Sequence, residues 1–335
     1  MDRDGQGAVP ADHGRVLMAR LGIVTVSYNV RDLLRQCLAS VQESLACGPV
    51  EAEVVVVDNA SADGSAAMVE REFPWVRLLV NERNAGFAAA TNLGLRALGF
   101  PDDGGPSYAL LLNPDTVVHG AALADLVAFM ERTPRAGACG PRLVYGDGSF
   151  QHSAFRFPTV AMAYFDFFMP HHRLLDSWLN GRYPRRLYER GAPFAVDHPL
   201  GAALLVRREA VARAGLLDEQ FFMYCEEIDW CRRIKAGGWS IYCVPQAEIV
   251  HLGGQSTQQF RADMFVALWR SRYRLFAKHN GRLYRRLVRL VVEAGLARGE
   301  ERVRQRVREG CLDQVAAQQM LAAYAEVRAL GRVLA

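Results

Sequence analysis

The sequence has 335 residues, of which 50% are hydrophobic and 23% are charged. This composition is ordinary for a globular protein and excludes a chain that is disordered throughout. The net charge of +4 is too small to indicate a nucleic-acid partner, and no apolar run reaches the roughly 18 residues that a membrane-spanning helix needs. The length suits either one large α/β unit or a core with an appendage.

The cysteines and the first residues give further expectations. Seven cysteines are an odd number and include no CxxC pair. They are therefore predicted to be buried, reduced thiols of a cytoplasmic protein and not a disulfide or zinc framework. Residues 1–18 are rich in Gly, Asp and Ala and are predicted to be a flexible tail. Whether translation starts at Met1 or at Met18 stays open.

The first half of the chain alternates apolar strands with amphipathic helices. Continuous apolar runs of strand length predict strands that are buried on both faces. Strands are expected at 21–27, 53–57, 76–80 and 108–112, and helices at 31–45, 65–72, 86–98 and 121–132. This alternation predicts an α/β fold with a parallel or mixed sheet and helices on both faces.

The second half is less regular. Strands are expected at 139–145, 201–206 and 239–244, helices at 208–214 and 228–236, and helical structure throughout from Arg261 onward. The aromatic segment 155–178 is assigned to the core, in preference to an acceptor groove or a membrane-facing loop. Nine arginines alternate with leucine and valine in Arg282–Arg308. This pattern suits a helix lying on anionic lipid, or an arginine face that packs on the core, and both interpretations stay open.

Polar side chains follow the predicted strands where those strands end. They include Ser27-Tyr28-Asn29, Asp58-Asn59, Asn81–Asn84 and Asn113-Pro114-Asp115. Ligands of open α/β sheets bind beyond the carboxyl ends of the strands. Turn-forming residues are common at any one such edge, but polar residues at every edge favour a ligand cleft.

Asp115 and His251 are candidate metal ligands. A carboxylate at the sheet edge is what a divalent cation with a bound diphosphate requires, because Mg²⁺ and Mn²⁺ take few ligands from the protein. His251 follows an apolar strand and precedes two glycines. Taken singly, Asp115 also suits a turn aspartate, and His251 suits a structural hydrogen-bonding residue.

Glu226, Glu227 and Asp229 form an acidic cluster at the predicted start of a helix. Carboxylates stabilise this end of a helix, so a structural role is open. The aromatic run before them also suits a dry pocket, which would raise the pKa of a carboxyl group toward that of a useful base. Helical spacing puts Glu226 and Asp229 on one face and turns Glu227 aside by about 100°. We expect Glu226 and Asp229 to accept hydrogen bonds from backbone donors or to pair with Arg232 or Arg233.

Taken together and in order, the motifs resemble those of the family 2 glycosyltransferases, and most closely the bacterial rhamnosyltransferase-like subgroup. The resemblance covers about residues 21–256. It is carried by the segments 24–29, 57–65, 81–92, 112–116, 201–207 and 218–230. The sequence contains no GxxxxGK[ST], GxGxxG or GxSxG motif, which weighs against NTPases, dinucleotide enzymes and α/β-hydrolases.

The resemblance implies a GT-A fold, a nucleotide-sugar donor, Mg²⁺ or Mn²⁺, and inversion at the anomeric carbon. It implies that Asp58 contacts the nucleobase and that Asp115 does most of the metal binding, with His251 as a second ligand. The usual Glu-Asp pair reads Glu226-Glu227 here, which makes Glu227 the expected base. The expected nucleotide-sugar residues are Ser27, Tyr28, Asn29, Asp58, Asn59, Asn84, Gly86, Asn92, Asn113 and Asp115.

The expected reaction transfers a sugar, with dTDP-L-rhamnose as the first choice of donor and UDP-sugars as the next. The acceptor is expected to be a saccharide or a polyprenyl-linked saccharide of the cell envelope, and the protein to be cytoplasmic with peripheral contact to the inner face of the membrane. A metal-dependent nucleotidyltransferase and a non-catalytic sugar-nucleotide-binding relative are the alternatives. The expected domains are a catalytic unit at 19–260, with halves 19–120 and 121–260, and a helical extension at 261–335.

Overall fold

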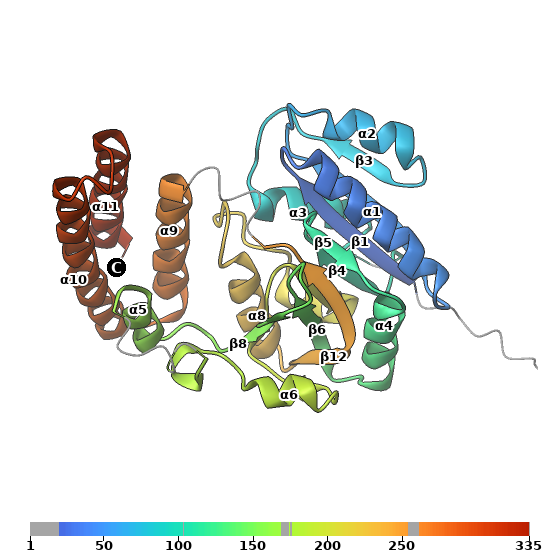
Figure 1. Ribbon diagram of the computed structural model, residues 1–335. Helices are drawn as coiled ribbons and strands as arrows, with labels where there is room; N and C mark the ends of the chain where they lie inside the picture. The colour runs from blue at the N-terminus through green and yellow to red at the C-terminus, as the bar shows by residue number, and fades with distance from the viewer. Residues whose placement is uncertain (1–19, 103, 169–173, 175, 254–260, 335) are drawn as a thin grey trace, which may run out of the picture.

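The computed structural model describes residues 20–102, 104–168, 174, 176–253 and 261–334, so the predicted tail at residues 1–18 lies outside the described residues. One large sheet with helices on both faces stands beside a group of long helices (Figure 1). Within the described ranges, no helix is both long and apolar enough to cross a bilayer.

The four strands and four helices predicted for the first half are confirmed. In chain order they are β1 (Arg20–Ser27), α1 (Arg31–Ala46), β2 (Glu51–Asp58), α2 (Ser65–Glu72), β3 (Arg77–Val80), α3 (Phe87–Ala97), β4 (Tyr108–Leu112) and α4 (Ala122–Arg132). A short strand that was not predicted, β5 (Thr116–Val118), lies between β4 and α4. Strands β3, β2, β1 and β4 lie side by side and parallel. Their carboxyl ends therefore meet at one edge of the sheet.

The second half of the chain adds further strands and helices. In chain order they are β6 (Ala136–Val144), β7 (Phe150–Gln151), β8 (Ala154–Phe155), α5 (Val160–Phe167), η2 (Trp178–Asn180), α6 (Arg185–Glu189), β9 (Phe194–Ala195), β10 (His198–Pro199), β11 (Ala203–Arg207), α7 (Arg208–Ala214), α8 (Glu226–Ala236) and β12 (Ser240–His251). Strands β8 and β10 pair with each other in a separate small sheet, and the other strands extend the large sheet. Beyond β4 the order is β11, β6, β12 and β5. Strand β11 runs antiparallel to both β4 and β6, so the sheet is mixed.

Alternation along the buried strands divides the core between the two faces of the sheet. In β2, Val54 and Val56 pack with α1, α2 and α4 on one face. Val55 and Val57 pack with α3, α7 and α8 on the other face. Because all four side chains are almost fully buried, the strand reads as a continuous apolar run, as expected for parallel strands covered on both faces.

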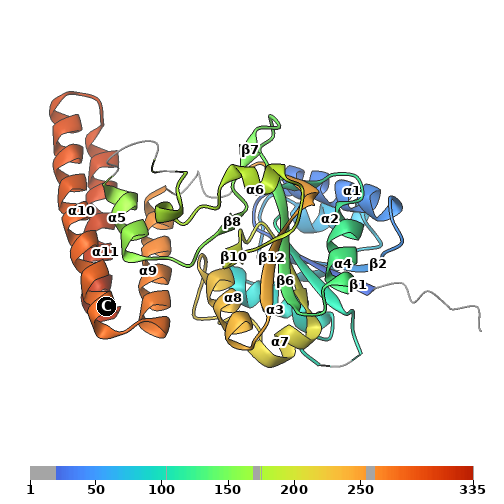
Figure 2. The same cartoon turned by 90° about the horizontal axis from the view of Figure 1, so that it is seen from below.

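The helical group consists of α5, α9 (Arg261–His279), α10 (Arg282–Arg308) and α11 (Gln314–Leu334). Both Figure 1 and Figure 2 show α9 between the sheet and the α10–α11 pair. Phe167 of α5 stacks on Trp269 of α9 with ring centroids 5.2 Å apart. A Cβ atom at Gly295 of α10 would overlap the side chain of Phe167, so glycine allows this close approach of α5 and α10.

Several sequence-based expectations need adjustment. Helix α8 begins at Glu226 and not at residue 228, and β12 continues to His251 instead of ending at residue 244. The aromatic segment is only partly core, because Tyr164 and Trp178 are exposed. The prediction that all seven cysteines are buried is wrong for Cys47 and Cys311, which lie exposed at the ends of α1 and α10, although all seven are free thiols.

Candidate functional site

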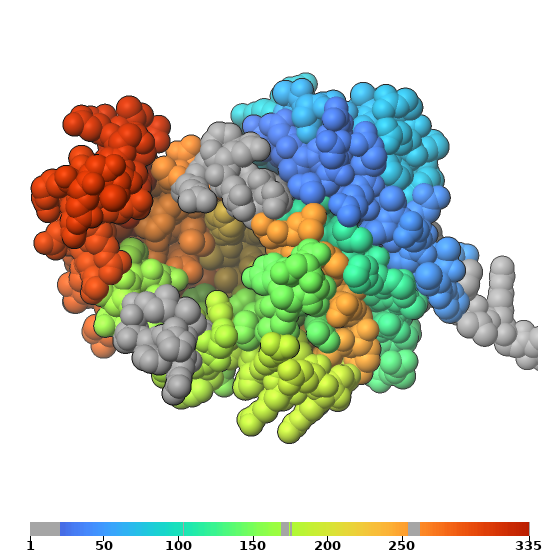
Figure 3. Space-filling view, in the orientation of Figure 1, coloured from blue at the N-terminus to red at the C-terminus, as the bar shows by residue number. Residues whose placement is uncertain are grey.

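A cavity of about 340 Å³ lies where the carboxyl ends of β1 and β4 meet the start of α8. The surface is hollowed between the helical group and the sheet (Figure 3). The cavity is lined by Val26, Tyr28, Asn59, Asn84, Phe87, Asn113, Pro114, Asp115, Leu200, Gly201, Ala202, Phe222, Met223, Tyr224, Glu226, Glu227, His251 and Met264. Residues that are far apart in the sequence, from Val26 in β1 to Met264 in α9, thus line one cavity.

The structure brings most of the expected site residues to this cavity. Those that line it are Tyr28, Asn59, Asn84, Asn113, Asp115, Glu226, Glu227 and His251. Ser27, Asn29, Asp58, Gly86, Asn92 and Asp229 are not among the lining residues. Most of this second set hold the lining residues or their loops in place.

Asp58 ends β2 with its side chain almost completely buried. Its Oδ1 accepts a hydrogen bond from the backbone N–H of Ser61 at 2.8 Å. Among the described residues, Oδ2 has no hydrogen-bond partner. Asn29 joins this turn to the end of β1, because its Oδ1 accepts from the N–H of Ala62 and its own N–H donates to Oγ of Ser61. One oxygen of this buried carboxyl group is therefore unsatisfied among the described residues, although Asp58 does not itself line the cavity.

Asn59 connects the turns after β2 and β3. Its Nδ2 donates to Oδ1 of Asn84 at 2.8 Å, and its Oδ1 accepts from Nδ2 of Asn81 at 2.9 Å. Gly86 follows with a positive φ of 85°, and a Cβ atom there would lie 2.5 Å from the backbone oxygen of Phe222. Glycine therefore lets the loop before α8 approach the start of α3.

Asn92 and Ser27 are buried behind the cavity. Asn92 Nδ2 donates to the carbonyl of Leu217 and to Oε1 of Glu219, and its Oδ1 accepts from the N–H of Leu217. These bonds attach α3 to the segment before α8. Ser27 is fully buried and its Oγ has no hydrogen-bond partner among the described residues.

Asp115 and His251 face each other because β5 pairs with the end of β12, with Thr116 opposite His251. The Nε2 atom of His251 lies 3.6 Å from Oδ1 of Asp115, and its Nδ1 lies 3.2 Å from Oε1 of Gln151. Burial raises the pKa of Asp115 although His251 opposes the shift, and burial lowers the pKa of His251. A carboxylate oxygen and a neutral imidazole nitrogen on one wall are suitable ligands for a divalent cation.

Glu226 and Glu227 enter the cavity from the first turn of α8. Burial raises the pKa of Glu226 well above its usual value, and the charge of Glu227 raises it further. Burial raises the pKa of Glu227 to about 7. Oε2 of Glu226 has no hydrogen-bond partner among the described residues, so the expectation that arginines or backbone donors hold Glu226 is not met for this atom. At neutral pH, Glu227 is poised to exchange a proton.

Asp229 turns away from the cavity and is completely buried. Arg233 Nε donates to its Oδ2 at 2.8 Å, as expected, and Nε2 of His279 lies 2.6 Å from its Oδ1. Lys278 Nζ lies 2.9 Å from the same oxygen. Burial alone would raise the pKa of Asp229, but hydrogen bonds from Lys278 and His279 and the charge of Arg233 lower it below its usual value.

The loop before α8 is strained and is held from α9. Tyr224 and Cys225 both have positive φ, at 68° and 66°, which is costly for residues with side chains. Ser271 Oγ of α9 donates to the carbonyl of Met223 at 2.7 Å. The expectation that the aromatic run before the acidic cluster borders a dry pocket agrees with Phe222 and Met223 in the cavity lining, whereas sequence reasoning missed Met264 of α9. The aromatic run Phe221-Phe222-Met223-Tyr224 was the one available signal.

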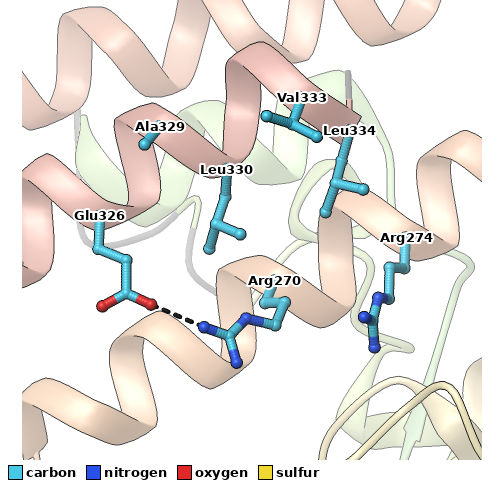
Figure 4. A pocket seen from close by; sticks show the side chains of 7 residues that line it. All are labelled: Arg270, Arg274, Glu326, Ala329, Leu330, Val333 and Leu334. Carbon is cyan, nitrogen blue, oxygen red and sulfur yellow. Dashed lines mark hydrogen bonds and ion pairs between the residues drawn. The ribbon is translucent and has the colours of Figure 1, made fainter.

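A second cavity of about 410 Å³ lies between α9 and α11. Figure 4 shows Leu330, Val333 and Leu334 of α11 around it, with Arg270 of α9 paired to Glu326. That ion pair is 2.6 Å long and neutralises the carboxylate that lines this cavity. The first cavity is therefore the better candidate for the functional site, because the candidate metal ligands and the candidate base line it.

Comparisons with known proteins show which proteins this chain is similar to. The model of the family "Glycosyl transferase family 2" matches residues 22–213. An N-acetylglucosaminyl-diphospho-decaprenol L-rhamnosyltransferase of Mycobacterium tuberculosis is 32% identical over 83% of this chain and 90% of its own. The dTDP-rhamnosyl transferase RfbF of Shigella flexneri is 23% identical over 61% of each chain.

A solved structure has the same fold. The mannosyltransferase PcManGT from Pyrobaculum calidifontis, in complex with GDP-Man and Mn²⁺, superposes with a TM-score of 0.54 at 16% identity. The match covers 95% of this chain and 87% of that one. The expected GT-A fold, a mixed sheet flanked by helices and followed by a helical C-terminal part, is thereby confirmed.

Proposed function

Because the chain belongs to glycosyl transferase family 2 and is a glycosyltransferase, we propose that it transfers L-rhamnose from dTDP-L-rhamnose to a saccharide hydroxyl. The acceptor is a saccharide or a polyprenyl-linked saccharide of the cell envelope, and the reaction takes place in the cytoplasm. The similarity to the rhamnosyltransferases of M. tuberculosis and S. flexneri supports this donor and acceptor. UDP-sugars are the second choice of donor.

One observation carries the proposal. A single cavity holds the Asp115–His251 pair on one wall and Glu227, with its pKa raised to about 7, on another. A diphosphate donor beside the first wall would present its anomeric carbon to an acceptor beside the second. The unpartnered Oδ2 of Asp58 would accept a hydrogen bond from the nucleobase at the end of β2.

The residues of this chain would act in sequence. Glu227 takes the proton of the acceptor hydroxyl, and that oxygen forms a bond to the anomeric carbon from the face opposite the diphosphate. The bond from the anomeric carbon to the diphosphate oxygen breaks, and the electron pair leaves with the nucleoside diphosphate. The configuration of the sugar is inverted. Burial and the charge of Glu227 raise the pKa of the neighbouring Glu226 well above its usual value.

Asp115 and His251 fit a divalent cation. The carboxylate and the imidazole face each other on the cavity wall, and Gln151 holds the second ring nitrogen of His251, as partners of histidine ligands often do. Two protein ligands suit Mg²⁺ or Mn²⁺, because these ions take few ligands from the protein and complete their coordination with diphosphate oxygens and water. When bound, such a cation supplies positive charge to the departing diphosphate.

Product analysis tests the proposal. Incubation with dTDP-L-rhamnose and an N-acetylglucosaminyl lipid acceptor should release dTDP and form a rhamnosylated product. Release of pyrophosphate would instead identify a nucleotidyltransferase, and nucleotide binding without either product would identify a non-catalytic relative. Competition by dTDP, UDP and GDP for the donor site tests the nucleotide, and a clear preference for GDP would contradict the proposed donor.

A further inference from the structure

Helix α10 carries an apolar stripe that no other described element covers. Leu283, Leu287 and Leu290 are 72%, 45% and 57% exposed. Their spacing of i, i+4 and i+7 puts them on one face of the helix. Large aliphatic side chains exposed in a row indicate a surface that meets a partner.

The same helix has a second apolar stripe that explains its packing. Val288, Val292 and Leu296 are fully buried against α5, α9 and α11. At about 100° per residue, these positions lie on the side of α10 opposite the three exposed leucines. Packing of the helical group therefore does not account for the exposed stripe. The alternative interpretation of the sequence, an arginine face that packs on the core, does not explain the exposed stripe either, because leucines and arginines lie together on the outer side of α10.

Positive charge borders the exposed stripe. Arg282 and Arg286 are both exposed, and within the part of the chain that the structure describes neither guanidinium forms an ion pair with a carboxylate. Arginines beside exposed leucines on a helix are typical of segments that lie at a bilayer surface. A second copy of this chain would bring the same arginines together, and their repulsion disfavours a self-associated dimer.

We propose that the face of α10 formed by Arg282, Leu283, Arg286, Leu287 and Leu290 binds the surface of an anionic phospholipid bilayer. The leucines enter the boundary of the acyl chains and the guanidinium groups contact lipid phosphates. This inference rests on the proposed function, because a polyprenyl-linked acceptor lies in the membrane. Figure 1 places α10 on the outer side of the helical group, away from the sheet.

Vesicle sedimentation tests the surface. The full chain should sediment with vesicles of phosphatidylcholine and phosphatidylglycerol, remain in solution with phosphatidylcholine alone, and dissociate at high salt. Combined Leu283→Gln, Leu287→Gln and Leu290→Gln should weaken binding at least tenfold. Arg282→Gln with Arg286→Gln should weaken it about fivefold per charge. Thermal unfolding should be unchanged, because these side chains are exposed.

Matched variants on the same helical group serve as controls. Val315→Gln with Val333→Gln removes apolar side chains that are 66% and 82% exposed on α11, and Arg306→Gln with Arg308→Gln removes two charges from the far end of α10. Both pairs should bind vesicles as the parent does. Equal binding of the leucine variant and the parent would overturn the proposal, as would a parental dimer that the leucine substitutions dissociate.

The lipid surface and the transfer reaction can fail separately. Release of dTDP measured with a water-soluble acceptor and without vesicles reports the reaction alone. Sugar transfer without vesicle binding would contradict the proposed lipid-binding face of α10 and leave the proposed function unaffected. Vesicle binding that depends on the leucines, without any transfer, would support the surface and overturn the proposed function.

Discussion

The wall of the cavity at the ends of β1, β2 and β4 is held by hydrogen bonds between neighbouring turns, whereas the wall at the start of α8 is held from α9. Asn59 bonds to Asn81 and Asn84 in the adjacent turn. By contrast, Asp229 of α8 depends on Lys278 and His279 at the end of α9. We call these the sheet-edge wall and the α8 wall.

The difference separates binding from chemistry. The sheet-edge wall is formed mainly by the turns after β1, β2 and β4, to which the end of β12 adds His251 beside Asp115, and its proposed task is to hold the nucleotide. The α8 wall carries the proposed base, and its geometry depends on contacts from the C-terminal helices. Substitutions on the two walls should therefore change different quantities, donor affinity for one and turnover or stability for the other.

The largest effect is expected from Glu227→Gln on the α8 wall. Loss of a general base costs about 10²–10⁴-fold in rate, so turnover should fall by that order. Donor affinity should stay nearly unchanged, because the donor does not need the base. Steady-state kinetics and calorimetric titration with the donor nucleotide measure the two quantities.

Two neighbours provide the controls for this substitution. Glu226→Gln and Asp229→Asn should disturb binding geometry or stability more than the chemical step. A Glu227→Gln variant with near-normal turnover, together with an Asp229→Asn variant that loses turnover but binds donor normally, would move the base to Asp229. The complete burial of Asp229 among cations argues against that outcome.

The next effect is expected from Asp115→Ala on the sheet-edge wall. The metal-dependent part of donor affinity should be lost while the fold is kept, because the substitution removes the carboxylate ligand. Calorimetry with and without Mg²⁺ or Mn²⁺ measures this part. Asp147→Ala, in the exposed turn before β7, is a matched control that should change nothing. Unchanged metal dependence in Asp115→Ala would show Asp115 to be a turn residue.

A third effect concerns the stability of the α8 wall. Removal of one partner of a buried ion pair costs about 3–5 kcal/mol. The basic side chains around Asp229 keep 18–36% of their surface exposed, so we expect Asp229→Asn to lower the free energy of unfolding by about 2–3 kcal/mol. Asp218→Asn, which loses one exposed partner in Lys278, should cost less than about 1 kcal/mol. Urea unfolding measures both.

The sign of the pH dependence follows from the lowered pKa of Asp229. A carboxyl group with a lowered pKa in the folded state stabilises the fold above its unfolded pKa of about 4, and this contribution is lost as the pH falls. The difference between the parent and Asp229→Asn should therefore be largest at neutral pH and shrink in acid. A difference that is constant from neutral pH to pH about 3 would contradict the ion-pair account.

The sequence predicted the sheet-edge wall better than the α8 wall. Asp58, Asn59 and Asp115 each end an apolar strand, so their place follows from local pattern and from the geometry of parallel sheets. Lys278 and His279 lie on a helix with no motif, and their contact with Asp229 spans about 50 positions. Local periodicity carries no information on such a contact, because it depends on how α9 packs against α8.

Asn92 illustrates a further limit. The resemblance placed it at the border of the nucleotide site, but its three hydrogen bonds go to Leu217 and Glu219. A motif shows which residues recur in order and does not show whether each one faces the ligand or supports a loop. The sequence also left open whether Arg282–Arg308 lies on lipid or packs on the core. The structure was needed here, because only the packing of α10 reveals which of its two apolar stripes is covered.

The smallest effect is expected in the pH profile of turnover, and it tests which carboxyl group on the α8 wall titrates. Burial raises the pKa of Glu227 to about 7, and a base acts only when it is deprotonated. Turnover should therefore rise with pH, level off above pH about 8, and fall about tenfold per pH unit below pH 7.

The variants show which carboxyl group causes this fall. The residual turnover of Glu227→Gln should no longer fall below pH 7. Burial and the charge of Glu227 raise the pKa of Glu226, and Glu226→Gln puts an uncharged amide at this position while it leaves Glu227 in place. The turnover of Glu226→Gln should still fall below pH 7. If this fall disappears in Glu226→Gln but persists in Glu227→Gln, the proton transfer belongs to Glu226.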